Sequence, residues 1–84
     1  MKKILIDTNV YVAFKAGNSE VTETFQRADS IGVSAIVLEE LYSGFRMGKK
    51  EKQNRDELEE FLYSPRVEVL LIDETTAEYY AAIF

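Results

Sequence analysis

The sequence predicts an α/β fold with a parallel sheet. Residues 4–6 are a short continuous apolar run, residues 32–34 and 66–72 also predict strands, and the segments between them carry apolar residues at helical spacing. Strands that alternate with helices favour parallel pairing through right-handed crossovers. The chain has 84 residues, fewer than the roughly 100 to 150 of a typical domain, so it accommodates one small domain or part of one.

The first part of the chain predicts one strand and two helices. Residues 4–6 form the first strand, and the polar residues 7–9 that follow can cap a helix. We expect that helix over residues 10–16, where a glycine and an asparagine stop it. Ser19 can cap a second helix, which we expect to end at residues 30–32.

The middle of the chain predicts a short strand followed by two helices. Residues 32–34 form the strand, and Ser34 can cap a third helix that ends near residues 44–48. Residues 49–63 are heavily charged and predict a solvent-facing helix attached along one edge, which Pro65 then ends.

The C-terminal part predicts a strand and a last helix. Residues 66–72 are the best strand of the chain, and Asp73 can cap a helix whose apolar stripe includes Tyr80 and Phe84. Because this stripe continues to the final residue without a cap or a polar tail, we interpret the end of the chain as a truncation.

The composition limits the available chemistry. The absence of histidine and cysteine excludes disulfide frameworks, zinc fingers, thiol nucleophiles and imidazole bases. Fifteen acidic and ten basic residues give a formal net charge of −5, so any contact with a polyanion must be local or bridged by a metal ion. No apolar run approaches the roughly 20 residues that span a membrane, and no signal-peptide core follows Met1. We therefore expect a cytoplasmic protein.

Three polar residues lie where predicted strands end, which is where parallel α/β sheets bind ligands. They are Asp7, Ser34 and Asp73. The alternative for the first is that Asp7 or Thr8 simply caps a helix. For Asp73 the cap is the favoured interpretation, because Thr76 three residues later fits an ordinary helix start.

Helical geometry separates the adjacent acids Glu39 and Glu40. At about 100° per residue, Glu40 lies at the margin of the apolar face of the third helix, with Gly44 leaving space one turn later. Glu39 instead shares a side with Ser43 and Arg46 and is expected in solvent. Glu40 is therefore the candidate ligand for a hard metal ion. The alternative is a boundary glutamate with its carboxylate in water.

Several segments resemble one family. Residues 4–10 (ILIDTNV) and 33–44 (VSAIVLEELYSG) are similar to the PIN-domain ribonucleases, most of all to the toxins of VapBC-type toxin-antitoxin pairs. The resemblance continues through residues 67–73 and 76–80. It implies a three-layer α/β/α fold with a parallel sheet. Residues 1–84 would be a partial PIN domain, its N-terminal two-thirds, truncated after the start of the fourth major helix.

The resemblance also implies a site and a function. The family's first acidic motif and its Glu-Leu-x-x-Gly motif correspond to Asp7 and Glu40, which would be catalytic and bind Mg²⁺ or Mn²⁺. Thr8 and Asn9 would orient Asp7 or contact a phosphate. Ser34, a candidate because it ends a predicted strand, would contact the substrate or support these residues. The implied activity is cleavage of RNA phosphodiesters by a toxin with a cognate antitoxin. An enzyme without histidine can hydrolyse such bonds with metal ions that carboxylates hold.

Two consequences follow from this interpretation. We expect the carboxyl groups of Asp7 and Glu40 to lie within about 4 to 7 Å, a separation that one cation or its bound water bridges. Two further acidic positions of the family lie beyond the end of this chain, so we expect the chain alone to be inactive.

The sequence is also compatible with other functions, and it predicts self-association. The chain could instead be an interaction module that binds an antitoxin or itself without cleaving RNA. Receiver and haloacid-dehalogenase domains fit poorly, because Thr8 and Asn9 stand where those families place acids. The family's strand order would leave strand one as an exposed edge in this chain, so we expect a homo-oligomer formed through residues 4–6, Tyr80 and Phe84.

Overall fold

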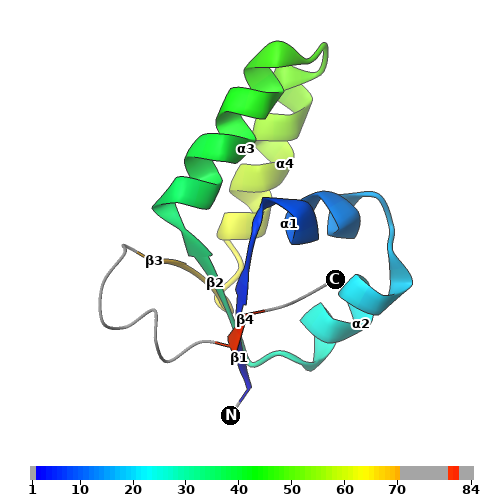
Figure 1. Cartoon of the computed structure of the whole chain (residues 1–84), viewed down its shortest axis with the longest axis vertical. Helices are drawn as coiled ribbons and strands as arrows, with labels where there is room; N and C mark the ends of the chain where they lie inside the picture. The colour runs from blue at the N-terminus through cyan, green and yellow to red at the C-terminus, as the bar shows by residue number, and fades with distance from the viewer. Residues whose placement is uncertain (1, 71–79, 82–84) are drawn as a thin grey trace.

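The computed structural model describes residues 2–70 and 80–81, in which strands and helices alternate. The elements are β1 (Lys3–Ile6), α1 (Thr8–Lys15), α2 (Ser19–Arg27), β2 (Ser30–Ser34), α3 (Ala35–Met47), α4 (Glu51–Leu62), β3 (Val67–Leu70) and β4 (Tyr80–Ala81). Figure 1 shows that α3 and α4 form an antiparallel hairpin that extends beyond the carboxyl ends of β1 and β2. In the described part of the chain, no helix is long and apolar enough to cross a membrane.

The four strands form one parallel sheet in the order β3-β2-β1-β4. In the pair formed by β1 and β2, Ile4 lies opposite Ile31 and Ile6 lies opposite Val33. Helices α1 and α2 connect β1 to β2, and α3 and α4 connect β2 to β3 (Figure 1). The predicted α/β class with a parallel sheet is confirmed.

Three helices begin at a side chain that accepts a hydrogen bond from the backbone N–H three residues later. Asp7 caps α1 at 2.8 Å, and Ser34 caps α3 at 3.2 Å. The cap of α2 is Asn18, at 3.0 Å, so the prediction of Ser19 was wrong. Gly17 explains this difference, because its positive φ of 85° turns the chain and leaves Asn18 as the extended residue before the helix.

The end of the second helix also differs from the prediction. The sequence extends this helix to residues 30–32, whereas α2 ends at Arg27 and β2 begins at Ser30. The Ser30 N–H donates to the Lys2 carbonyl at 3.2 Å, and Ile31 is paired with residues of both β1 and β3. Residues 30 and 31 therefore form part of β2 and not of the helix, because β2 pairs with β1 on one side and with β3 on the other.

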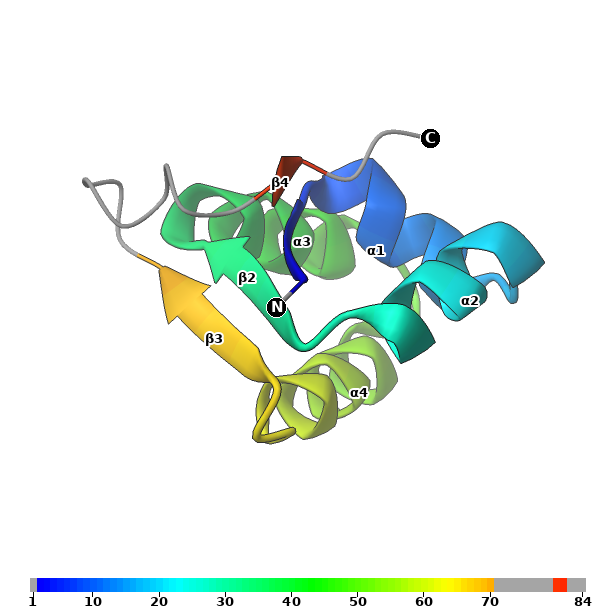
Figure 2. The same ribbon diagram turned by 90° about the horizontal axis from the view of Figure 1, so that it is seen from below.

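A hydrophobic core joins the sheet to the helices. Figure 2 shows α1, α2 and α4 on one side of the sheet. The buried core residues are Ile4, Ile6, Val10, Tyr11, Val21, Phe25, Ala28, Ile31, Val33, Val37, Leu41 and Leu58. Leu58 is fully buried, so the charged helix α4 is anchored in the core along one edge, as predicted.

Three phenylalanine rings join α1, α2 and α4. The ring centroids of Phe14 and Phe25 lie 4.6 Å apart, and those of Phe14 and Phe61 lie 5.7 Å apart. Phe25 and Phe61 close the triangle at 6.0 Å. These separations are favourable for aromatic pairs, so the rings fix how the three helices pack together.

Arg66 joins the end of α2 to the start of β3. Its Nη1 donates to the Phe25 carbonyl at 2.9 Å and to the Ala28 carbonyl at 2.8 Å. Its own carbonyl accepts from the Ile31 N–H at 2.7 Å. The Phe25 carbonyl also accepts from the Ala28 N–H at 3.3 Å, so the guanidinium adds a second donor there and supplies one to the Ala28 carbonyl beyond the helix.

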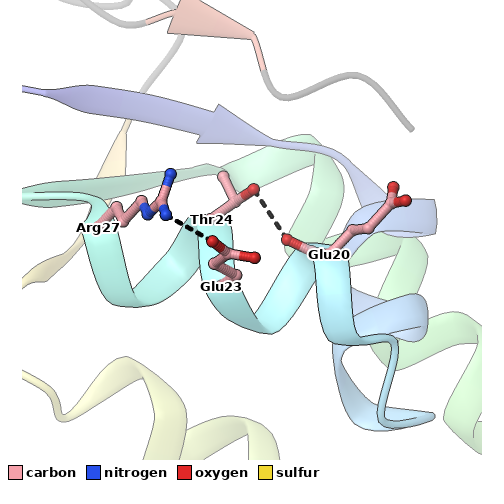
Figure 3. Close-up of polar contacts among 4 residues, drawn as sticks. All are labelled: Glu20, Glu23, Thr24 and Arg27. Carbon is pink, nitrogen blue, oxygen red and sulfur yellow. Dashed lines mark hydrogen bonds and ion pairs between the residues drawn. The ribbon is translucent and has the colours of Figure 1, made fainter.

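The exposed side of α2 carries short-range polar contacts, which Figure 3 shows. Arg27 pairs with Glu23 at 2.6 Å, and the Thr24 hydroxyl donates to the Glu20 carbonyl at 2.9 Å. Both partners of the ion pair are more than half exposed, so the pair contributes only about 0.3 to 0.5 kcal/mol. Burial of residues such as Phe25 is therefore the main anchor of α2.

The segment Tyr80–Ala81 is a strand, so the helix predicted there was wrong. It pairs in parallel with Ile4 and Leu5 of β1, which therefore has a neighbour on each side at these residues. A strand at this position satisfies backbone groups that a bare sheet edge would leave unpaired, which a helix cannot do. The prediction that strand one is an exposed edge of the sheet was therefore also wrong. Self-association stays a prediction, and the rest of the last predicted helix, with Asp73 and Phe84, lies outside the described residues.

Tyr11 has a buried hydroxyl in this core. The residue is 3% exposed, and within the described part of the chain its hydroxyl has no hydrogen-bond partner. Burial raises the pKa of Tyr11 to about 12, and the nearby Glu57 carboxylate acts in the same direction. The neutral hydroxyl is therefore the form that the folded protein favours.

Tyr11→Phe should remove an alkaline loss of stability. The Tyr11 pKa is about 10 in an unfolded chain and about 12 in the folded protein, so its contribution to stability is fully present below pH 10. It is lost as the pH rises from about 10 to 12. Urea unfolding across this range should show a flatter decline for Tyr11→Phe than for the original protein. At neutral pH the substitution should cost little, because it breaks no hydrogen bond.

Tyr63→Phe is the matched control, since Tyr63 is 90% exposed. It should follow the original protein at every pH. If the stability of Tyr11→Phe falls with alkaline pH as steeply as that of the original protein, a group other than Tyr11 causes the loss.

Candidate active site

The candidate site lies at the edge of the sheet where β1 and β2 end. Asp7 follows the last residue of β1 and is the N-cap of α1, so the backbone on both sides of it is fixed. Ser34 ends β2 and is the N-cap of α3, the helix that carries Glu40. Because β1 and β2 are parallel neighbours, α1 and α3 both start at this edge (Figure 1).

A hydrogen bond of Thr8 links these two helices. The Thr8 Oγ1 donates to the Glu40 Oε1 at 2.8 Å. Thr8 is the first residue of α1 and directly follows Asp7, so the Glu40 carboxylate lies against the start of α1. Glu39 lines a separate hollow of about 330 Å³ with Arg46. Of the two adjacent glutamates, Glu40 is therefore the one that reaches the end of β1.

Each of the two carboxylates uses one oxygen in a hydrogen bond to another described residue. Asp7 Oδ1 accepts from the Val10 N–H at 2.8 Å, and Glu40 Oε1 accepts from Thr8. Within the part of the chain that the structure describes, Asp7 Oδ2 and Glu40 Oε2 have no hydrogen-bond or ion-pair partner. Both residues are exposed, and a Cβ added to Gly44 would meet nothing within 4 Å. The free oxygens are thus open to a cation from solvent.

The donor set suits a hard divalent ion but is small. Carboxylate oxygens are the ligands that Mg²⁺ and Mn²⁺ prefer. Among residues 2–70 and 80–81, no group of three or more histidine, cysteine, aspartate or glutamate side chains could hold a metal ion. Asp73 lies outside the described residues. The separation of about 4 to 7 Å between the carboxyl groups of Asp7 and Glu40 stays a prediction.

The polar residues expected at the site have different surroundings. Asn9 is exposed, and its side chain makes no hydrogen bond to any described residue. Ser34 uses its hydroxyl oxygen as the cap of α3. The resemblance implied that Thr8 orients Asp7 or contacts a phosphate. In the structure its hydroxyl donates to Glu40. No signal in the sequence pairs Thr8 with Glu40, because they lie 32 positions apart on different helices.

Basic residues near the start of α4 are paired with acids of the same helix. Lys52 contacts Asp56 at 2.9 Å, and this hydrogen bond raises the pKa of Lys52. Arg55 lies 3.7 Å from Glu51 and 4.9 Å from the centre of the Tyr42 ring. These contacts agree with the solvent-facing helix that the sequence predicts over residues 49–63.

Comparisons with known proteins give a family and similar solved structures. A family model described as PIN domain matches residues 4–84. No curated protein matches the chain. A chain in the crystal structure of VapBC2 from Rickettsia felis, bound to a DNA fragment from their promoter, is similar, with a TM-score of 0.67 and 27% sequence identity. The match covers 90% of the present chain and 59% of that chain, so the present chain spans less than two thirds of its length.

The cap geometry predicts that two substitutions of Asp7 will differ in stability. Asp7→Ala removes the acceptor for the Val10 N–H and should cost about 1 kcal/mol. Asp7→Asn keeps an oxygen that can accept this hydrogen bond and should cost less than about 0.5 kcal/mol, although it removes the charge. Urea unfolding of both variants measures the difference. Equal losses would mean that the cap is not what Asp7 contributes to the fold.

Proposed function

The chain belongs to the PIN domain family, and on that premise we propose that it acts in the metal-dependent cleavage of RNA, as the toxin of a toxin-antitoxin pair. PIN domains are generally nucleases that use divalent metal ions, and the similarity to a chain of a VapBC2 complex supports the toxin class. The proposal adds RNA as the substrate, Mg²⁺ or Mn²⁺ as the ion, and Asp7 and Glu40 as its ligands.

The observation that supports the proposal most is the hydrogen bond from Thr8 to Glu40. It holds a carboxylate of α3 against the residue that follows Asp7, while each acid keeps one oxygen that has no partner among the described residues. A boundary glutamate with its carboxylate only in water would not make this contact. The location, beyond the carboxyl end of β1, is the place where parallel α/β sheets bind their ligands.

The proposed roles follow from the chemistry of the chain's own groups. Asp7 and Glu40 would hold the ion with their free oxygens, and the Val10 N–H and Thr8 hydroxyl would keep both carboxylates oriented. When bound, the ion supplies a water of lowered pKa and positive charge near the phosphate. That charge would also let a protein with a net charge of −5 accept an RNA strand. Asn9 and Ser34 would lie close enough to contact the phosphate.

The proposed partners are an RNA substrate, a cognate antitoxin and a second copy of the chain. The antitoxin is supported by the similarity to a chain of VapBC2, which is a complex. Self-association was inferred from an exposed edge at strand one, which β4 covers at Ile4 and Leu5, so that argument no longer supports it. Sedimentation at tens of micromolar protein tests it.

A second candidate function is an interaction module that binds an antitoxin or itself without cutting RNA. It is favoured by the small number of acids, because two carboxylates leave most positions around an ion to water. Such an ion is bound weakly and is poorly placed for attack on a phosphate. The cleavage assay below separates the two candidates.

We predict that the 84-residue chain alone has no appreciable ribonuclease activity. A longer polypeptide that continues through the rest of a PIN domain should cleave single-stranded RNA when Mg²⁺ or Mn²⁺ is present and should stop when the metal is chelated. Asp7→Asn in this polypeptide should lower cleavage by about 100-fold or more, because it removes a charged ligand while keeping the cap. The measurement is a paired assay of both lengths on one labelled RNA.

Two outcomes would change the conclusion. If the short chain cuts RNA and Asp7→Asn abolishes the cut, acids outside the described residues or from a second copy complete the site. If neither length cuts RNA, the interaction module is the better description.

A further inference from the structure

The hydroxyl of Thr8 has a different kind of hydrogen-bond acceptor from the hydroxyls of Thr22 and Thr24. Thr22 and Thr24 donate to backbone carbonyls one turn earlier in their own helix, as Figure 3 shows for Thr24 and Glu20. Thr8 is the first residue of α1, so no helical carbonyl lies one turn before it. Its hydroxyl is therefore available for a side chain of another helix, and it donates to Glu40 at 2.8 Å.

This contact fixes a side chain that would otherwise be free to rotate. Glutamate has three rotatable bonds, and Glu40 is exposed on α3. Within the described residues, the hydrogen bond from Thr8 is the one contact that an oxygen of the Glu40 carboxylate makes. A hydrogen bond to a charged acceptor is short and strong, so it selects the rotamers in which Oε1 faces α1.

We propose that Thr8 is a positioning residue that holds the Glu40 carboxylate in place for a divalent cation. It acts through Glu40 and does not itself need to touch the ion. The donor occupies Oε1, and Oε2 has no hydrogen-bond or ion-pair partner among the described residues. This inference rests on the proposed function, because it assumes that Asp7 and Glu40 share one ion.

A purely structural role is the competing explanation. The same hydrogen bond ties the start of α1 to α3, so its loss could lower stability without any effect on a cation. The two explanations differ in what happens to Mn²⁺ binding in a variant that stays folded. Mn²⁺ is a suitable probe because its unpaired electrons broaden the NMR signals of nearby nuclei, even when binding is weak.

The experiment titrates Mn²⁺ into the ¹⁵N-labelled 84-residue chain and follows the amide signals next to Asp7 and next to Glu40. Thr8→Val keeps the branched shape and removes the donor, and Thr8→Ser keeps the donor. We expect Thr8→Val to weaken the apparent affinity for Mn²⁺ by about tenfold, as loss of a hydrogen bond to a metal ligand does. Broadening near Glu40 should fall more than broadening near Asp7. Thr8→Ser should restore the original pattern.

Thr24→Val is the matched control, because it removes a hydroxyl hydrogen bond within α2, a helix that holds neither acid. It should leave Mn²⁺ binding unchanged. Thermal unfolding of each variant reports stability separately, and Thr8→Ala replaces Thr8→Val if the valine variant does not fold.

The outcomes separate the inference from the proposed function. If Asp7→Asn abolishes the broadening at both places and Thr8→Val matches the original protein, Thr8 does not position Glu40, although the metal site stands. If Thr8→Val and Thr24→Val weaken binding equally, the effect is structural and the inference is wrong. If Asp7→Asn leaves the Mn²⁺ pattern intact, the metal site and the proposed function both fail.

Discussion

The parallel pairing of β1 with β2 brings the carboxyl ends of both strands to one edge of the sheet. Since Asp7 follows β1 and Ser34 ends β2, the two helices that cap on these residues must start side by side. An antiparallel pair would send one of them to the opposite edge. The position of Glu40 beside the start of α1 is therefore a consequence of strand direction, and it needs no long loop to place it.

The first turn of α1 supplies donors to both acids. The Val10 N–H and the Thr8 hydroxyl each hold one oxygen, at 2.8 Å in both cases. The N-terminus of a helix also carries a partial positive charge, which favours negative groups nearby. The start of α1 therefore holds one oxygen of each acid in the folded chain before any cation arrives.

The sequence was informative where a short stretch of residues decides the outcome. Ser34 was correctly identified as a cap, because a hydroxyl that follows an apolar run and precedes a helical pattern has few other uses. The sequence-based prediction failed where pairing with residues far along the chain determines the secondary structure. Ile31 fits a helix or a strand equally well until β1 and β3 pair on either side of it. Tyr80 lies on a convincing helical stripe, yet it pairs with β1. The contact between Thr8 and Glu40 has no local signature at all.

The hydrogen bonds of Arg66 affect where the length of this fold can vary among relatives. The chain departs from the sheet at the Ser34 cap and returns at Arg66, where three hydrogen bonds fix it to the end of α2 and the start of β2. The α3–α4 hairpin between these anchors is closed at its base, and Met47 at its far turn is 90% exposed. Whole helical turns can be inserted or deleted at that tip while Glu40, near the base, keeps its place. Insertions and deletions among homologues should therefore concentrate there.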